Sequence, residues 1–86
     1  MPILSIFFGI VVWMFHDDHA PAHFHVEYAE HRAVIEIATG RVLHGRLPRR
    51  LARLVEEWRR MHVRRLERAW IDAQEGRQPR RIPPLT

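Results

Sequence analysis

The chain begins with a strongly apolar segment that carries no charged side chain before His16. Residues 6–15 are rich in Ile, Val, Phe and Trp, which is typical of a strand buried on both faces. The segment is shorter than the roughly 20 residues that a membrane-spanning helix needs, and it lacks the basic start and small-residue cleavage site of a signal peptide. We therefore expect a buried strand, in which Gly9 marks a bulge or a close backbone approach.

Three shorter strands are expected after a loop at residues 16–22. In the first of them His23, His25 and Glu27 alternate on one face, while the aromatic and aliphatic residues between and after them face the core. Because short turns rich in Gly and polar residues join the strands, they form an antiparallel meander. The four expected strands lie at about residues 6–15, 23–28, 32–37 and 41–44.

The second half of the chain has helical periodicity over residues 48–75, from Pro48, which suits a first helical position, to the stop at Gly76. A continuous helix of this length would span about 40 Å, whereas six-residue strands span only about 20 Å. Either the helix breaks near residues 62–64 into a hairpin, or its far half packs on another chain. The latter would be a homodimer through the stripe that contains Trp58 and Trp70.

These elements predict one α+β domain over residues 1–77: a four-stranded antiparallel sheet followed by one long or broken amphipathic helix. A chain of 86 residues is long enough for a single small domain. Residues 78–86 contain three of the six prolines and are expected to form an extended tail.

The charge is distributed unevenly along the chain. Residues 1–40 carry a net charge of −4 and residues 41–86 carry +8, and every basic residue is Arg. Such a basic half suits an anionic partner, either nucleic acid or an acidic protein, although a solvated Arg-rich helix would have the same composition. The absence of cysteine excludes disulfides and cysteine metal sites.

The strongest chemical signal lies in residues 16–28, which contain four of the seven histidines and three of the ten acidic residues. Imidazole and carboxylate groups bind Zn, Fe, Ni or Mn, and an open coordination position would allow hydrolysis. The candidate metal ligands are His23, His25 and Glu27 on the strand and Asp18 and His19 in the loop.

Two other interpretations of the same histidines remain open. In a metal-free ribonuclease, His23 and His25 would act as general base and general acid, and Arg32 or Arg46 would support the phosphate. Alternatively, the two imidazoles are structural and hold the loop through the acidic pair at positions 17–18.

Several short motifs are similar to those of a known family of small bacterial proteins, which is named only as a domain of unknown function. The family signature is a start like Met-Pro-x-Ile-x-x-Phe-x-Gly, then Asp-His-x-Pro-Pro-His-Phe-His, then a helix with a late Trp, which Trp70 would match. In this chain Ala20-Pro21-Ala22 replaces the usual Pro-Pro, a change that affects loop stiffness more than chemistry. The matching segments are Pro2-Ile3, Ser5, Phe7-Phe8-Gly9-Ile10, residues 17–28 and Gly45-Arg46-Leu47-Pro48.

The resemblance implies a compact α+β domain in the bacterial cytoplasm. Because the apolar segment is too short to span a membrane, no membrane partner is expected. Genes of this family often lie beside another small gene in arrangements like toxin–antitoxin pairs. We therefore expect a toxin-type component that acts on or binds RNA through its His-Phe-His face, with a cognate small protein as partner. The alternative is a non-enzymatic binding module, antitoxin-like or regulatory, in which the histidines are structural.

Overall fold

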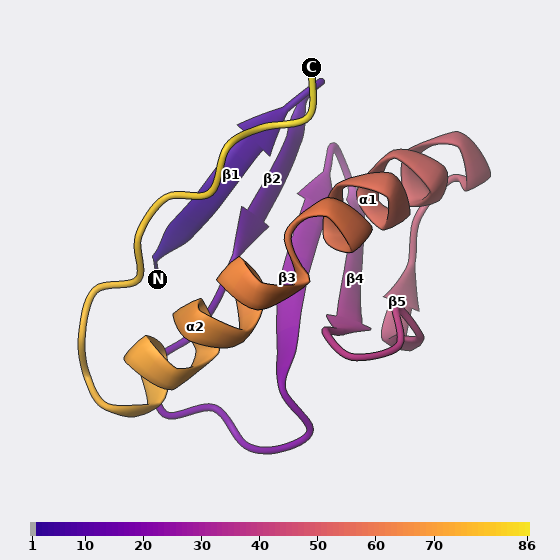
Figure 1. Cartoon of the computed structure of the whole chain (residues 1–86). Coiled ribbons are helices and arrows are strands. Elements are labelled where there is room, and N and C mark those ends of the chain that lie inside the picture. The colour runs from indigo at the N-terminus through magenta and orange to yellow at the C-terminus, as the bar shows by residue number, and fades with distance from the viewer. Residues whose placement is uncertain (1) are drawn as a thin grey trace.

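A computed structural model describes residues 2–86 as five strands followed by two helices (Figure 1). All neighbouring strands are antiparallel, and their order across the sheet is their order along the chain. The α+β meander is thus confirmed, with one strand and one helix more than expected. The elements are β1 (Ile3–Phe7), β2 (Ile10–Trp13), β3 (His23–Tyr28), β4 (His31–Glu36), β5 (Val42–Arg46), α1 (Arg49–Met61) and α2 (Val63–Gln74).

The additional strand arises because the expected strand at residues 6–15 is two strands joined by a tight hairpin. Phe8 and Gly9 have φ angles of +50° and +80°, and two consecutive positive φ angles are what a two-residue hairpin turn of type I′ requires. A side chain at Gly9 would press against the Tyr28 ring, at 3.2 Å from its Cε1. The expected continuous strand was wrong because Phe8 carries no turn signal and extends the apolar run.

The expected single helix is interrupted at His62, so the break expected near this position is confirmed. His62 has a φ of −129°, and its backbone N–H donates to the Arg59 carbonyl at 3.0 Å. The two helices do not fold back into a hairpin, however. Figure 1 shows α2 continuing from α1 at an angle, so that both helices follow the same face of the sheet.

The core lies between that face and the two helices. Phe24 and Val26 of β3 point into it, as the alternation predicted, and Tyr28 packs against its edge. Trp58 is completely buried, between Phe7 at 5.4 Å and Phe24 at 5.9 Å between ring centroids. Trp58 therefore has no surface to offer a second chain, and a homodimer would have to use other residues.

The C-terminal tail is extended and packs along the first strand of the sheet, as Figure 1 shows. The Ile82 N–H donates to the Leu4 carbonyl at 2.7 Å, and the Trp58 indole donates to the Pro83 carbonyl at 2.9 Å. Ile82 and Leu85 are buried. The tail thus contributes two side chains to the core.

The other face of the sheet carries the polar side of β3. The register places Trp13, His25, Val34 and His44 side by side in a row across β2, β3, β4 and β5. This is the face that carries the two imidazoles of the His-Phe-His segment. Among residues 2–86, neither helix combines the length and the apolar character required to span a membrane.

Candidate metal centre

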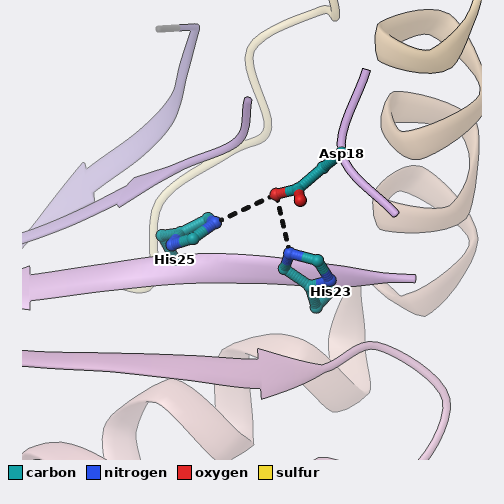
Figure 2. Close-up of side chains that lie close together, drawn as sticks. All are labelled: Asp18, His23 and His25. Carbon is teal, nitrogen blue, oxygen red and sulfur yellow. Dashed lines mark hydrogen bonds and ion pairs between the residues drawn. The ribbon is translucent and has the colours of Figure 1, made fainter. Parts of the chain in front are cut away.

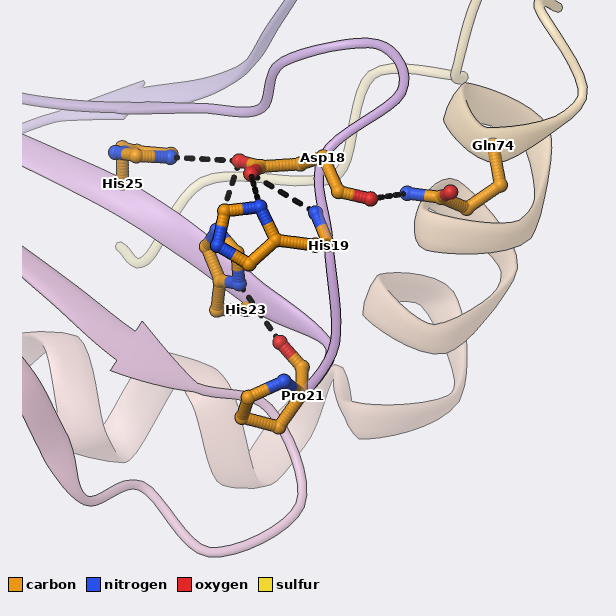
Figure 3. A network of polar contacts seen from close by, with 6 residues as sticks. All are labelled: Asp18, His19, Pro21, His23, His25 and Gln74. Atoms are coloured by element: carbon orange, nitrogen blue, oxygen red, sulfur yellow. Dashed lines mark hydrogen bonds and ion pairs between the residues drawn. The ribbon is translucent and has the colours of Figure 1, made fainter.

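The loop between β2 and β3 brings Asp18 back over the beginning of β3. At its start Asp17 has a positive φ of +56°, and the chain reverses there. The Asp18 carbonyl accepts a hydrogen bond from the Gln74 side chain of α2 at 2.7 Å, and Asp18 Oδ1 accepts one from the His19 backbone N–H at 3.0 Å (Figure 3). These contacts fix both the backbone and the carboxylate of Asp18.

Asp18, His23 and His25 converge on one point (Figure 2). Oδ2 of Asp18 lies 2.8 Å from Nε2 of His23 and 3.4 Å from Nε2 of His25. Each residue offers one potential ligand atom, and the three atoms lie within 4.8 Å of one another. Their side chains are only 9–16% exposed. The loop and the strand therefore form a shielded cluster of two imidazoles and one carboxylate.

His23 is placed between two oxygen acceptors. Its Nδ1 lies 2.7 Å from the Pro21 carbonyl oxygen, while its Nε2 faces the Asp18 carboxylate. A neutral imidazole has one N–H, whereas both a carbonyl and an ionised carboxylate can only accept. If the single N–H is on Nδ1 and donates to Pro21, the pair Nε2 and Asp18 has no hydrogen between its two atoms. That contact becomes favourable when a second proton or a metal cation lies between them.

Aromatic rings surround the two imidazoles. Trp13 stacks on His25, with ring centroids 4.2 Å apart and an angle of 11° between the planes, and Phe15 meets His25 edge-on at 5.0 Å. Trp70 of α2 lies 5.1 Å from His23. The indole Nε1 of Trp13 is buried and has no hydrogen-bond partner among residues 2–86. These rings restrict the imidazoles to the observed orientations.

The electrostatics favour the charge states that a metal needs. Burial raises the pKa of the Asp18 carboxyl, but hydrogen bonds from His23, the His19 backbone and His25 outweigh it and hold the pKa below its ordinary value. Burial lowers the pKa of His25, against the opposing hydrogen bond to Asp18. At neutral pH the carboxylate is therefore ionised and His25 is neutral, which are the forms that bind metals.

The remaining candidate residues lie around this cluster. Glu27 lies further along β3, where Oε1 is 3.6 Å from Nε of Arg32 and both side chains are more than a third exposed. Arg46 is paired with Arg32 in the register. His19 is 95% exposed, with Nδ1 3.5 Å from Asp18 Oδ1. The structure thus joins Asp18 with His23 and His25, and places Glu27 and Arg32 together elsewhere on the same face.

Trp13, Gln74 and the Pro21 carbonyl are site residues that were absent from the sequence-based candidates. Trp13 was assigned to a buried strand, and its pairing with His25 depends on the register of β2 against β3. Gln74 lies 56 positions after Asp18, and no local pattern connects them. A neutral amide at the end of an amphipathic helix is in itself no sign of a site.

The fold and the cluster together define a small α+β domain with two histidines and one aspartate at the end of a sheet. The chain belongs to the family described as Domain of unknown function (DUF4160), whose pattern it matches over residues 9–71. This match includes all three clustered residues, all of α1 and α2 as far as residue 71. No curated protein and no solved structure matches the chain.

Proposed function

We propose that Asp18, His23 and His25 hold one divalent transition-metal ion, with Zn²⁺ as the first candidate. The observation that carries this proposal is the position of His23 between two acceptors. Histidines that bind metals typically donate the second ring N–H to a backbone carbonyl and direct the other nitrogen at the ion. Pro21 supplies that carbonyl, and the ion supplies the positive charge required between Nε2 and Asp18.

The distances suit such an ion. Zinc takes nitrogen and oxygen ligands at about 2.0–2.2 Å in a tetrahedron, so the ligand atoms are about 3.4 Å apart. The His25–Asp18 distance is 3.4 Å and the His23–Asp18 distance is 2.8 Å, so a small outward rotation of the carboxylate would admit the ion. Two imidazoles and one carboxylate leave at least one coordination position for water.

The chemistry that this arrangement supports is hydrolysis, and we propose RNA as the substrate because residues 41–86 carry a net charge of +8. A divalent ion lowers the pKa of a bound water and polarises a phosphoryl oxygen. In hydrolysis the water oxygen bonds to phosphorus and one P–O ester bond breaks. One water proton ends on the departing oxygen and the other on the new phosphomonoester, from which it ionises.

In a cell this activity would make the protein the toxin-type component of a two-gene module, inhibited by a cognate small protein in the cytoplasm. Uncontrolled cleavage of cellular RNA would arrest growth. The second candidate is a non-enzymatic binding module. It is favoured by the same hydrogen bonds of His23, which link the Pro21 carbonyl to Asp18 and would hold the loop without any metal.

Elemental analysis and titration calorimetry with Zn²⁺, Mn²⁺, Ni²⁺ and Fe²⁺ separate these candidates. We expect close to one ion per chain in the parent, and loss of binding in Asp18→Asn, His23→Ala and His25→Ala. His31→Ala is the matched control, because His31 is the first residue of β4, opposite Tyr28 at the far end of β3, and its ring lies beside Glu30 and away from the cluster. Saturating metal should also raise the melting temperature, by the equivalent of about 2.7 kcal/mol at 100 times Kd.

Two outcomes would overturn the metal centre. One is the absence of ion binding at any pH between 6 and 8. The other is binding that survives in all three site variants. If His23→Ala then lowers stability by about 1–3 kcal/mol, as expected for an orphaned buried partner, the histidines are structural. Metal-loaded protein that leaves single-stranded RNA intact would remove hydrolysis while keeping the metal site.

A further inference from the structure

A groove distinct from the metal centre runs between α2 and the C-terminal tail. Its volume is about 680 Å³. Asp72 is the one acidic residue of its lining, and Ala69, Gln78, Ile82 and Pro83 are uncharged. Five guanidinium groups line it: Arg65, Arg68, Arg77, Arg80 and Arg81.

Most of this positive charge is not neutralised within the chain. Arg77 is paired with Asp72 at 2.8 Å and also contacts Glu75. Arg68, Arg80 and Arg81 form no ion pair with any of residues 2–86. Like charges held in one concave surface repel each other and raise the local positive potential. An anion that enters the groove is therefore attracted by all of these guanidinium groups together.

The groove is also held in shape. Arg80 and Arg81 immediately precede Ile82, whose side chain is buried and whose N–H is bonded to Leu4. The following residue, Pro83, accepts the Trp58 hydrogen bond. Because the backbone that carries the two arginines is anchored, a ligand does not have to order a flexible tail when it binds.

A second, smaller hollow adjoins the groove. Arg81 and Gln78 also line a smaller hollow of about 460 Å³, together with Pro2, Ile3 and His16. His16 begins the loop that carries Asp18, and Gln74 of α2 is bonded to Asp18 itself. Two residues of the groove thus also line a hollow with His16, two positions before Asp18. Figure 3 shows that the C-terminal end of α2 is bonded to the loop that carries Asp18.

We propose that this groove binds the phosphates of single-stranded RNA and leads the strand to the metal centre. Guanidinium groups match phosphate oxygens with two parallel hydrogen bonds. A linear polyanion with one phosphate per nucleotide can contact several of these guanidinium groups at once. The proposal names the substrate-binding surface of the proposed function and rests on it for the choice of RNA.

Fluorescence anisotropy with a labelled single-stranded RNA of about ten nucleotides tests the groove. The test variant is the triple substitution Arg68→Gln, Arg80→Gln and Arg81→Gln. The matched control, Arg49→Gln, Arg50→Gln and Arg53→Gln, removes three exposed charges from the first turns of α1. We expect the groove variant to bind at least tenfold more weakly. The slope of log K against log salt concentration should become shallower by about 0.7 for each phosphate contact that is lost. The control should remain within about threefold of the parent.

Binding is measured first in EDTA, so that a failure of the metal centre does not affect the result. If the groove variant and the control lost affinity for RNA equally, the proposal would be overturned, since the RNA would then be attracted by the net charge of the protein alone. So would equal affinity for poly-glutamate, which would make the groove a docking site for an acidic protein. If the groove result holds but Zn²⁺ never binds, the proposed function fails and the RNA-binding surface remains. With metal bound and RNA cleaved, the groove variant should show a raised KM and an unchanged kcat.

Discussion

The Gln74 side chain donates a 2.7 Å hydrogen bond to the Asp18 backbone carbonyl, 56 positions earlier in the chain. This contact joins the last residue of α2 to the loop that carries the carboxylate of the candidate metal centre (Figure 3). The position of the proposed ligand thus depends on a helix that supplies no ligand itself.

Replacing Gln74 by Leu should loosen the loop while leaving all three clustered side chains in place. We expect stability to fall by about 0.5–1.5 kcal/mol, the net value of one hydrogen bond, and Zn²⁺ affinity to fall several-fold. Calorimetric titration and thermal melting of the same sample measure both effects. Ile71→Ala, an exposed change one turn earlier on α2, is the control. Unchanged metal affinity in Gln74→Leu would show that the loop holds Asp18 without the helix.

The C-terminal tail should contribute to stability far more than its irregular structure suggests. Ile82→Ala and Leu85→Ala each remove a buried side chain, and each should cost about 2–4 kcal/mol in denaturant unfolding. Pro84→Ala, at an exposed position between them, should change little. Equal and small effects of all three substitutions would mean that the tail leaves the sheet in solution.

Stability should fall in acid partly through Glu56. The Arg59 hydrogen bond, with a further contribution from Arg60, lowers the Glu56 pKa from 4.5 to about 2. A carboxyl with a lowered pKa stabilises the fold above its unfolded pKa, and this contribution is lost as the pH falls from about 4.5 to about 2. Glu56→Gln should therefore be less stable than the parent at pH 6 and approach it near pH 2. Melting curves at several pH values, with Glu57→Gln as the exposed control, test this expectation.

His62 should weaken the fold as the pH falls below neutral. Burial, and then the nearby charge of Arg65, lower the His62 pKa below its ordinary value of 6.5. The unfolded chain therefore binds a proton that the folded chain resists, so stability declines as the pH falls below about 6.5.

His62→Leu should remove this decline. It should also remove the buried Nε2, which has no hydrogen-bond partner among the described residues. The difference in melting temperature between His62→Leu and the parent should grow from pH 7 to pH 5. Parallel curves would show that His62 does not titrate differently in the two states. His44→Leu, at an exposed position of β5, is the control.

The meander and the two faces of β3 could be predicted from the sequence because each depends on local patterns. Alternation placed Phe24 and Val26 in the core, and both are buried. The hairpin at Phe8 was not predicted, since an aromatic residue in a left-handed conformation is unusual. Gly9, within a ten-residue apolar segment, was the available signal, and it was interpreted as a bulge or a close backbone approach. The close approach, to the Tyr28 ring, is present, but the turn was missed.

The sequence predicted which kinds of residue form the candidate site, but not which of the candidate residues lie together. The sequence offered five candidate metal ligands in one segment, and the structure brings three of them together. Which carboxylate faces the histidines depends on the path of the loop, which Gln74 fixes from the other half of the chain. Alternation correctly put Glu27 on the histidine face, yet position along the strand separates it from the cluster, and Arg32 lies beside it instead.

The contact between Ile82 and Leu4 has a consequence for self-association. An outer strand with free backbone groups is a template on which further chains can add, and proteins commonly blunt such edges. At β1 the tail covers part of this edge, because the Ile82 N–H is bonded to the Leu4 carbonyl. At the opposite edge, β5 also has five residues, but it contains His44 and Arg46, and Gly45 lies so close to the Arg32 carbonyl that any side chain would collide with it. Loss of the tail would therefore expose the more apolar of the two edges, and aggregation would be expected to begin at β1.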